Sequence, residues 1–342
     1  MRIGILTGGG DAPGLNSVIR AFVRCAVQDG HEVIGLRNGW AGLVHDVPPM
    51  NLDLNSISGI LHRGGTILGT SRTNPFKSQE SFASFKRNFK KLSLSALVAI
   101  GGEDTLGAAA KLVEKGLPIV GVPKTIDNDL SGTDYTFGFD TAVNIVMEAI
   151  DRLHTTAESH HRIMVVEVMG RHAGWIALHS GIAGGADVIL IPEFPTSIEE
   201  VVKTVKSRQQ RGKNFSIVVV AEGARIKGHT LVTKDPKKDE FGHVLLGGVA
   251  QTLAFELEKR TGLETRVTQL GHIQRGGSPT AFDRMLGTRF GVKAFELVKK
   301  KRWGYMAALQ GNEITEIRIK TAVGKLKVVD KKLYELAQKF FG

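Results

Sequence analysis

Short, continuous runs of apolar residues alternate along the chain with longer segments in which apolar residues recur every three or four positions. The short runs are typical of buried strands, and the longer spacing is typical of helices with one buried face. The expected strands are 3–7, 33–36, 96–100, 119–122, 163–168, 188–191 and 216–221, and the expected helices include 140–155, 198–208 and 281–299. This alternation predicts an α/β fold with mainly parallel sheets.

The length of the chain, 342 residues, favours two lobes over one. Counting strands places the boundary between two Rossmann-like lobes near Gly138. In open α/β sheets, ligands bind beyond the carboxyl ends of the strands. The side chains that carry chemistry are therefore expected directly after the strands.

The first expected strand is followed by the glycine-rich loop 8–14, Gly-Gly-Gly-Asp-Ala-Pro-Gly. Glycines let a backbone approach a ligand closely, and the start of the next helix offers unpaired N–H groups, so the loop suits a phosphate. It has neither the Gly-Lys-Ser/Thr of a Walker A loop nor the Gly-x-Gly-x-x-Gly of a dinucleotide site. A tight strand-to-helix turn is the alternative interpretation.

Two further loops carry acidic residues. Segment 101–107 reads Gly-Gly-Glu-Asp-Thr-Leu-Gly, and segment 123–129 reads Pro-Lys-Thr-Ile-Asp-Asn-Asp. Mg²⁺ is usually held by one or two carboxylates together with phosphate oxygens. Phosphoryl transfer to a hydroxyl group also needs a base and nearby cations. One aspartate of 123–129 can serve as the base and the other can help to hold the metal. The alternatives are that the acids of 101–107 only stabilise the first turn of a helix, and that 127–129 is a plain Asp-Asn-Asp turn.

Cationic residues gather in two other loops, 169–174 (Met-Gly-Arg-His-Ala-Gly) and 271–277 (Gly-His-Ile-Gln-Arg-Gly-Gly), with Arg162 just before a strand. Arginine and histidine within glycine-rich loops suit a phosphate dianion. Taken singly, such residues are more often structural.

Composition narrows the class of protein. The net charge of +11 favours anionic partners, but the basic runs 299–302 and 325–339 contain few aromatic residues and are interpreted as solvated faces rather than a nucleic-acid surface. A lone cysteine, Cys25, fits a reducing compartment. No signal peptide and no apolar run of about 20 residues is evident. We expect a cytoplasmic protein that binds neither membranes nor nucleic acid.

Five motifs in order give the chain a resemblance to the 6-phosphofructokinases that extends from residue 1 to about residue 300. They are 8–14, 64–72 (Gly-Gly-Thr-Ile-Leu-Gly-Thr-Ser-Arg), 124–129, 169–171 and 271–277. The resemblance implies an active site in the cleft between two α/β lobes. Residues 1–138 plus about 277–325 would bind the phosphoryl donor, and about 139–276 plus 326–342 would bind the sugar phosphate.

The resemblance also assigns roles to single residues. Asp127 is implied as the base that takes the proton from the 1-hydroxyl of fructose 6-phosphate, and Glu103 and Asp129 as Mg²⁺ ligands. Thr125 and Arg171 are implied beside the transferring phosphoryl group, Gly9, Gly10 and Arg72 at the donor phosphates, and Met169, Gly170 and Glu222 at the sugar. The 6-phosphate is expected among Arg162, Arg266, His272 and Arg275. In this family Arg162 and Arg266 would come from a neighbouring subunit, which implies a homodimer or homotetramer with shared active sites.

Two departures from the family pattern bear on the donor. ATP-using members usually have Asp-Gly where this chain has Glu103 and Asp104, and Gly where it has Lys124. A carboxylate at position 104 would repel the α-phosphate of ATP, whereas pyrophosphate ends before that point and gains the charge of Lys124. We therefore assign Asp104 and Lys124 to the catalytic, donor-binding group and expect pyrophosphate as donor, with ATP as the alternative. The alternative is that neither residue binds the donor: Asp104 then only caps a helix, and Lys124 faces solvent.

Other classes explain the sequence less well. A Rossmann-type oxidoreductase does not need two aspartates beside Lys124, and lipid and NAD kinases lack the cluster of Arg162, Arg266, His272 and Arg275. A sugar-phosphate-binding protein without catalysis would not need Asp127. Nucleic-acid binding rests on net charge alone.

Overall fold

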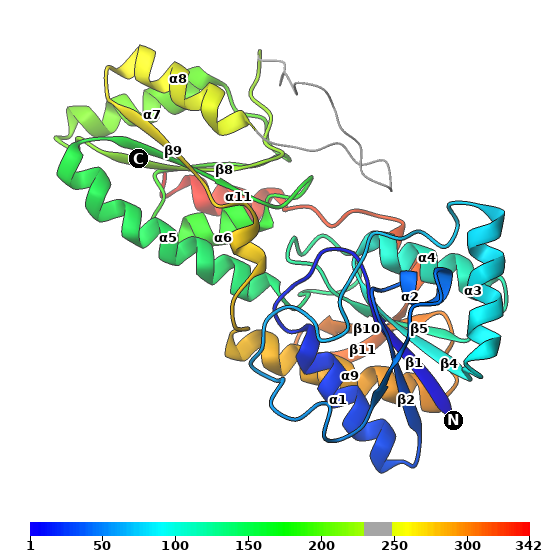
Figure 1. The fold of residues 1–342 in the computed structure, drawn as a ribbon. Coiled ribbons are helices and arrows are strands. Elements are labelled where there is room, and N and C mark those ends of the chain that lie inside the picture. The colour runs from blue at the N-terminus through cyan, green and yellow to red at the C-terminus, as the bar shows by residue number, and fades with distance from the viewer. Residues whose placement is uncertain (229–247) are drawn as a thin grey trace.

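A computed structural model describes residues 1–228 and 248–342 of the chain and shows two α/β lobes side by side (Figure 1). The larger lobe contains a seven-stranded sheet with the order β11-β10-β5-β4-β1-β2-β3. Its strands are β1 (Arg2–Thr7), β2 (Glu32–Leu36), β3 (Met50–Leu52), β4 (Ala96–Gly101), β5 (Ile119–Pro123), β10 (Tyr305–Gln310) and β11 (Glu313–Arg318). The pairs β1–β2, β1–β4, β4–β5 and β5–β10 are parallel, and only the edge strands β3 and β11 pair antiparallel.

Both faces of this sheet are covered by helices, which explains why its central strands are continuously apolar. On one face lie α1 (Leu15–Gln28) and α9 (Ala281–Lys299), and their core includes Ile3 and Ile5 of β1. On the other face lie α2 (Ala41–Val44), α3 (Gln79–Lys91), α4 (Glu103–Glu114) and α10 (Ile319–Val323), and their core includes Leu6. Side chains of β1 therefore alternate between two cores, as the period of a strand requires.

The smaller lobe has a wholly parallel four-stranded sheet with the order β7-β8-β6-β9. Its strands are β6 (Ile163–Val168), β7 (Val188–Leu190), β8 (Ser216–Ala221) and β9 (Thr265–Gln269). Around them pack α5 (Phe139–His160), α6 (Trp175–Ala183), α7 (Ile198–Gln210), α8 (Val249–Thr261) and α11 (Lys331–Gln338), and the 3-10 helix η1 (Gly271–Arg275) follows β9. The predicted α/β class with mainly parallel sheets is confirmed.

Helix 281–299 has the predicted bounds, and the helix expected at 140–155 continues to His160 in α5. The β10–β11 hairpin was not predicted. Its two-residue loop, Gly311-Asn312, is a known hairpin signal, so periodicity alone was too narrow a criterion. Across the described residues, no helix combines the length and apolarity needed to cross a membrane.

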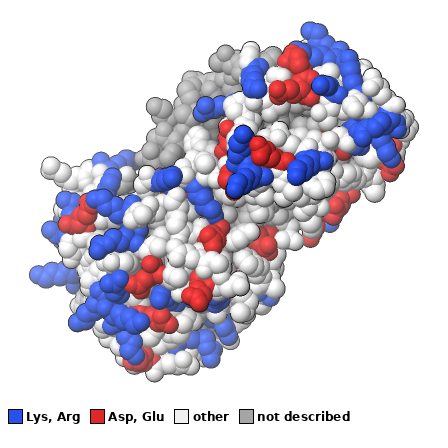
Figure 2. Space-filling view, turned by 180° about the vertical axis from the view of Figure 1, so that it is seen from behind, with Lys and Arg blue, Asp and Glu red and all other residues white. Residues whose placement is uncertain are grey.

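Some side chains of the basic runs near the end of the chain pair with acids. Lys299 contacts Asp29 at 2.9 Å, and Arg302 contacts Glu316 at 2.6 Å. On the face seen in Figure 2, lysine and arginine side chains form several groups separated by acidic and uncharged ones. This distribution is typical of a solvated surface.

Candidate active site

The glycine loop after β1 is closely packed, which explains its composition. A Cβ at Gly8 would lie 2.6 Å from Oγ1 of Thr105, and a Cβ at Gly10 would lie 2.6 Å from Nη1 of Arg275. Gly9 has a φ of 76°, in the left-handed region that favours glycine. Larger residues at these positions would displace the side chains that line the site.

Lys124 reaches this loop from the end of β5. Its side chain is buried, with 3% of the residue exposed, and its ammonium donates to the carbonyls of Gly8, at 3.0 Å, and Gly10. Burial, and secondly the charge of Arg275, lowers the pKa of Lys124 to about 7. The lysine therefore faces the glycine loop and not solvent, which excludes the interpretation of Lys124 as a surface residue.

Asp127 and Asp129 lie on the loop that continues from Lys124. The backbone N–H of Asp127 donates to Oγ1 of Thr125 at 3.0 Å, and Oδ1 of Asp127 is buried without a hydrogen-bond partner among the described residues. Burial, followed by the negative charges of Asp127 and Glu103, raises the pKa of Asp129 to about 7. An unpaired buried oxygen beside crowded carboxylates is an environment that a cation or a donated proton would stabilise.

Glu103 and Asp104 occupy the first turn of α4, where acids are favoured by the helix dipole. Within residues 1–228 and 248–342, no three acidic, histidine or cysteine side chains come close enough to enclose a metal on their own. Mg²⁺ does not need such a cage, because phosphate oxygens and water complete its shell. Glu103 and Asp129, which line one pocket, therefore fit a Mg²⁺ ion held jointly with a phosphate ligand.

This pocket between the lobes brings together most of the predicted catalytic, donor-binding and metal-binding residues, and with them Arg275 of the predicted 6-phosphate group. They are Gly9, Gly10, Glu103, Asp104, Lys124, Thr125, Asp127, Asp129, Arg171 and Arg275. Arg171 comes from the smaller lobe, and Nη1 of Arg275, on η1, donates to the carbonyl of Asp11 at 3.2 Å.

A second cavity, of about 530 Å³, adjoins the donor pocket. Glu103 and Asp104 line both spaces, and Asn74, Phe76 and Lys111 are among the other residues of the second one. Asp104 therefore lies where a ligand extending from the donor pocket into this cavity would pass.

The predicted sugar-binding residues follow the strands of the smaller lobe. The backbone N–H of Arg171 donates to Oε1 of Glu222 at 3.0 Å, and the pKa of Glu222 is raised to about 7 by burial. The N–H of Met169 donates to Oε1 of Gln274 at 3.2 Å, and Gly170 has a φ of 141°, in the region that favours glycine. Arg171 lines the pocket, whereas Met169, Gly170, Glu222 and Gln274 are not part of its lining.

Two further predicted residues, Arg72 and His272, are not part of the pocket lining. Arg72 is exposed, next to Ser71, whose carbonyl accepts from the N–H of Gly9 at 3.2 Å. His272 is exposed on η1.

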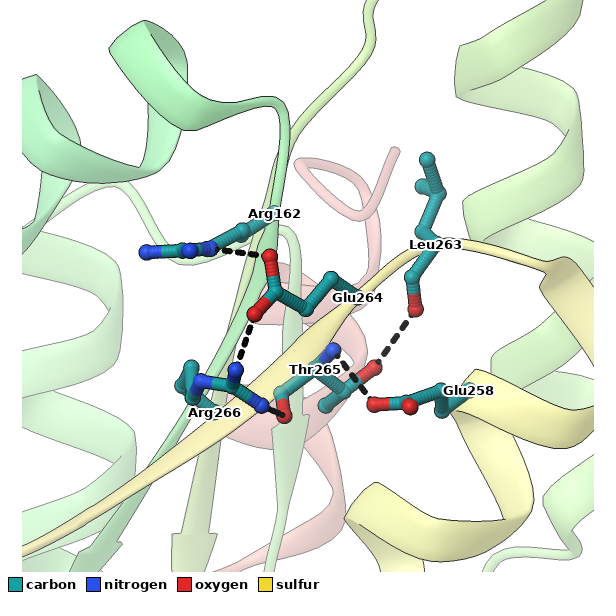
Figure 3. Close-up of polar contacts among 6 residues, drawn as sticks. All are labelled: Arg162, Glu258, Leu263, Glu264, Thr265 and Arg266. Atoms are coloured by element: carbon teal, nitrogen blue, oxygen red, sulfur yellow. Dashed lines mark hydrogen bonds and ion pairs between the residues drawn. The ribbon is translucent and has the colours of Figure 1, made fainter.

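Arg162 and Arg266 lie elsewhere, held by one carboxylate (Figure 3). Nε of Arg162 donates to Oε2 of Glu264 at 2.6 Å, and Nη2 of Arg266 donates to Oε1 of the same side chain. Both arginines are at the amino ends of β6 and β9, whereas Arg171 and Glu222 follow the carboxyl ends of strands of the same sheet. A six-residue strand at about 3.3 Å per residue separates these ends by roughly 20 Å, so one chain does not bring the two groups together.

The sequence analysis missed two residues of the site. Thr105 lines the pocket and packs against the loop at Gly8. Gln274 is fully buried, and besides accepting from Met169 it donates to the carbonyl of Gly271 at 3.0 Å. The sequence did contain a signal for both residues, because Thr105 lies in the glycine-rich motif 101–107 and Gln274 in the motif 271–277.

A family model described as Phosphofructokinase matches residues 2–298. The chain belongs to the phosphofructokinase family. A pyrophosphate–fructose 6-phosphate 1-phosphotransferase from Streptomyces coelicolor is 58% identical over 100% of both chains. ATP-dependent 6-phosphofructokinase 3 from the same organism is 52% identical over 99% of both.

A solved structure agrees with this membership. Phosphofructokinase from Pichia pastoris in the T-state is 33% identical, with a TM-score of 0.84 over 99% of this chain and 36% of the other. The phosphofructokinase resemblance expected from the motifs is thus confirmed.

Proposed function

We propose that the chain transfers a phosphoryl group from pyrophosphate to the 1-hydroxyl of fructose 6-phosphate, giving fructose 1,6-bisphosphate and orthophosphate. Three relatives that are 55–58% identical over the whole chain carry the name of this pyrophosphate-dependent activity. The observation that carries the choice of donor is the pair of charges at the donor pocket, where Lys124 is buried against the glycine loop and Asp104 borders the adjoining cavity.

ATP is the second candidate donor. The cavity of about 530 Å³ beside the pocket offers room for a larger donor, and relatives that are 50–52% identical are named ATP-dependent. The carboxylate of Asp104 at its entrance is the argument against ATP, because it repels an α-phosphate that passes it.

In this mechanism a carboxylate oxygen of Asp127 accepts the proton of the 1-hydroxyl as the sugar oxygen attacks the donor's phosphorus. The bond from phosphorus to the bridging oxygen breaks, and orthophosphate leaves. The unpaired Oδ1 of Asp127 is available for that proton. Thr125 and Arg171, which line the same pocket, stabilise the transferring group, and Lys124 offsets charge on the donor.

Mg²⁺ is the proposed cofactor, with Glu103 and Asp129 as its protein ligands. It supplies positive charge to the phosphate oxygens as negative charge develops during transfer. Gly9 and Gly10 approach the donor phosphates through their backbone. Arg72 would also bind the donor phosphates, because it follows Ser71, whose carbonyl accepts from the N–H of Gly9.

We propose that Met169 and Gly170 contact the sugar ring and that Glu222 binds the sugar hydroxyls. The lobe formed by 1–138 and about 277–325 would bind the donor, and the lobe formed by about 139–276 and 326–342 would bind the sugar phosphate. Such a division agrees with the two sheets, since β1 to β5, β10 and β11 build one and β6 to β9 the other.

The 6-phosphate is assigned to His272 and Arg275 of one subunit together with Arg162 and Arg266 of a neighbour. The separation of roughly 20 Å between the two ends of β6 supports a shared site, because one chain cannot supply all four groups to one phosphate. The assembly would then be a homodimer or homotetramer. We place it in the cytoplasm, where the lone Cys25 stays reduced.

Replacing Asp127 by Ser tests the assigned base. We expect kcat to fall about 10²–10⁴-fold, the usual contribution of a positioned base, with KM for fructose 6-phosphate nearly unchanged. Asp46→Ser, at an exposed aspartate paired with Lys91, is the matched control and should leave both constants unchanged. An Asp127→Ser enzyme with near-normal kcat would end the assignment.

A further inference from the structure

A strap formed by residues 324–330 joins the two lobes between α10 and α11 (Figure 1). At one end, α10 packs on α4 of the larger lobe. At the other end, Tyr334 of α11 stacks on Phe194 of the smaller lobe with ring centroids 4.8 Å apart. No function assigned above uses this strap.

In its middle the strap binds the loop that carries Asp127 and Asp129, the acidic loop of the active site. The backbone N–H of Lys327 donates to the carbonyl of Asp129 at 2.9 Å, and Leu326 forms a β-bridge with Leu130. The ammonium of Lys327 donates to the carbonyls of the next turn, those of Thr133 at 3.0 Å and Asp134 at 2.5 Å. One residue thus holds the loop both at Asp129 and beyond it.

The same residue also contacts the smaller lobe. Nε1 of Trp175, the first residue of α6, donates to the carbonyl of Lys327 at 2.9 Å. The Lys327 ammonium lies 5.1 Å from the ring centroid of Trp175 and 6.0 Å from that of Tyr135, within the range of cation–π attraction. Two residues on, the N–H of Val329 donates to Oε1 of Glu193 at 3.0 Å.

We propose that Lys327 is a positioning residue that fixes the acidic loop carrying Asp127 and Asp129 against the start of α6. The Arg171 segment leads directly into α6, so the lysine sets the distance between the two halves of the reaction site. It does not touch the reacting atoms. Because the proposal concerns the geometry of the transfer step, it rests on the proposed function for its kinetic consequence.

The loop has other anchors, and the main-chain bonds of residue 327 to Asp129 and Trp175 do not depend on its side chain, so replacing the Lys327 side chain should loosen the loop rather than unfold it. Oγ1 of Thr136 donates to the carbonyl of Thr125 at 2.7 Å, and the N–H of Thr136 donates to Oδ1 of Asn128 at 3.1 Å. These bonds stay in a Lys327 variant. A loosened loop shifts the base relative to the sugar, and a displacement of about 1 Å costs up to about 10²-fold in rate.

The test compares Lys327→Met with the wild type. Methionine keeps an unbranched chain between the two rings but cannot donate to the carbonyls of Thr133 and Asp134. We expect kcat to fall by about 10- to 100-fold while KM for fructose 6-phosphate changes by less than about threefold. Lys327→Arg should retain most of the activity, and Lys325→Met, at an exposed position of the same strap, should match the wild type.

Amide hydrogen exchange provides a second measurement that needs no turnover. The segment 126–136 should exchange faster in Lys327→Met than in the wild type, with the rest of the larger lobe unchanged. Wild-type kcat in Lys327→Met, or unchanged exchange in this segment, would overturn the proposal even if the melting temperature fell. A wild type inactive with every donor would refute the proposed function instead, and the exchange result would still decide the role of Lys327.

Discussion

Replacing Asp104 by Gly should move the enzyme's preference from pyrophosphate toward ATP. Asp104 is half-buried in the first turn of α4 and borders both the donor pocket and the cavity of about 530 Å³. For an ATP molecule that extends into this cavity, we take about 5 Å as the separation between its α-phosphate and the carboxylate. At that separation and an effective dielectric constant near 20, two unit charges repel by about 3 kcal/mol. Solvent screening reduces this to about 1.4–2.7 kcal/mol, or roughly 10- to 100-fold in kcat/KM.

The assay measures kcat/KM for each donor at saturating fructose 6-phosphate and Mg²⁺. Asp104→Asn separates charge from bulk, because it keeps the size of the side chain and should produce much of the change if repulsion dominates. Glu114→Gln, at another part of the same cavity, is the control and should leave the ratio of donors unchanged. A ratio within about twofold of wild type in Asp104→Gly would refute the reasoning.

Other predictions concern the phosphate site and stability. Arg162→Ala and Arg266→Ala should each raise KM for fructose 6-phosphate at least about 10-fold, since each removes a charge-assisted contact worth about 1.5–3 kcal/mol; an unchanged KM would count against the site. Asp127→Ser and Arg162→Ala chains, mixed under conditions of subunit exchange, should regain activity, and no recovery despite exchange verified by mass spectrometry would favour a site within one chain. Burial raises the pKa of Asp283 from its ordinary 3.8 to about 6, so the folded state holds this proton more tightly than the unfolded state. The free energy of unfolding should therefore fall by about 3 kcal/mol in total as pH rises from about 3 to about 7, from below the unfolded pKa to above the folded one. Asp283→Asn should flatten this part of the profile in urea titrations, and a slope equal to that of the wild type would contradict the assignment.

The residues of the donor pocket could be predicted from the sequence because they follow parallel strands. The carboxyl ends of β1, β4 and β5 lie at one edge of the sheet, so the loops beginning at Gly8, Gly102 and Lys124 had to converge there. What the sequence did not reveal was the direction of the Lys124 side chain. That direction depends on the packing of Gly8 and Gly10, which only the folded chain defines.

Contacts between distant segments were beyond the sequence pattern. Arg162 and Glu264 meet because β6 and β9 are neighbours in register, although about 100 residues separate them along the chain. Lys327 lies in a strap with no regular periodicity, and its partners lie nearly 200 residues earlier. Neither local propensity nor motif spacing encodes such long-range pairings.

The most direct test of the central claim is a ³¹P NMR measurement on the wild-type enzyme with fructose 6-phosphate, Mg²⁺ and either pyrophosphate or ATP. We predict that pyrophosphate is consumed with stoichiometric formation of fructose 1,6-bisphosphate and orthophosphate, at a kcat/KM far above that for ATP. Efficient turnover of ATP with none of pyrophosphate would contradict the assignment of the donor, and no bisphosphate with either donor would contradict the proposed function itself.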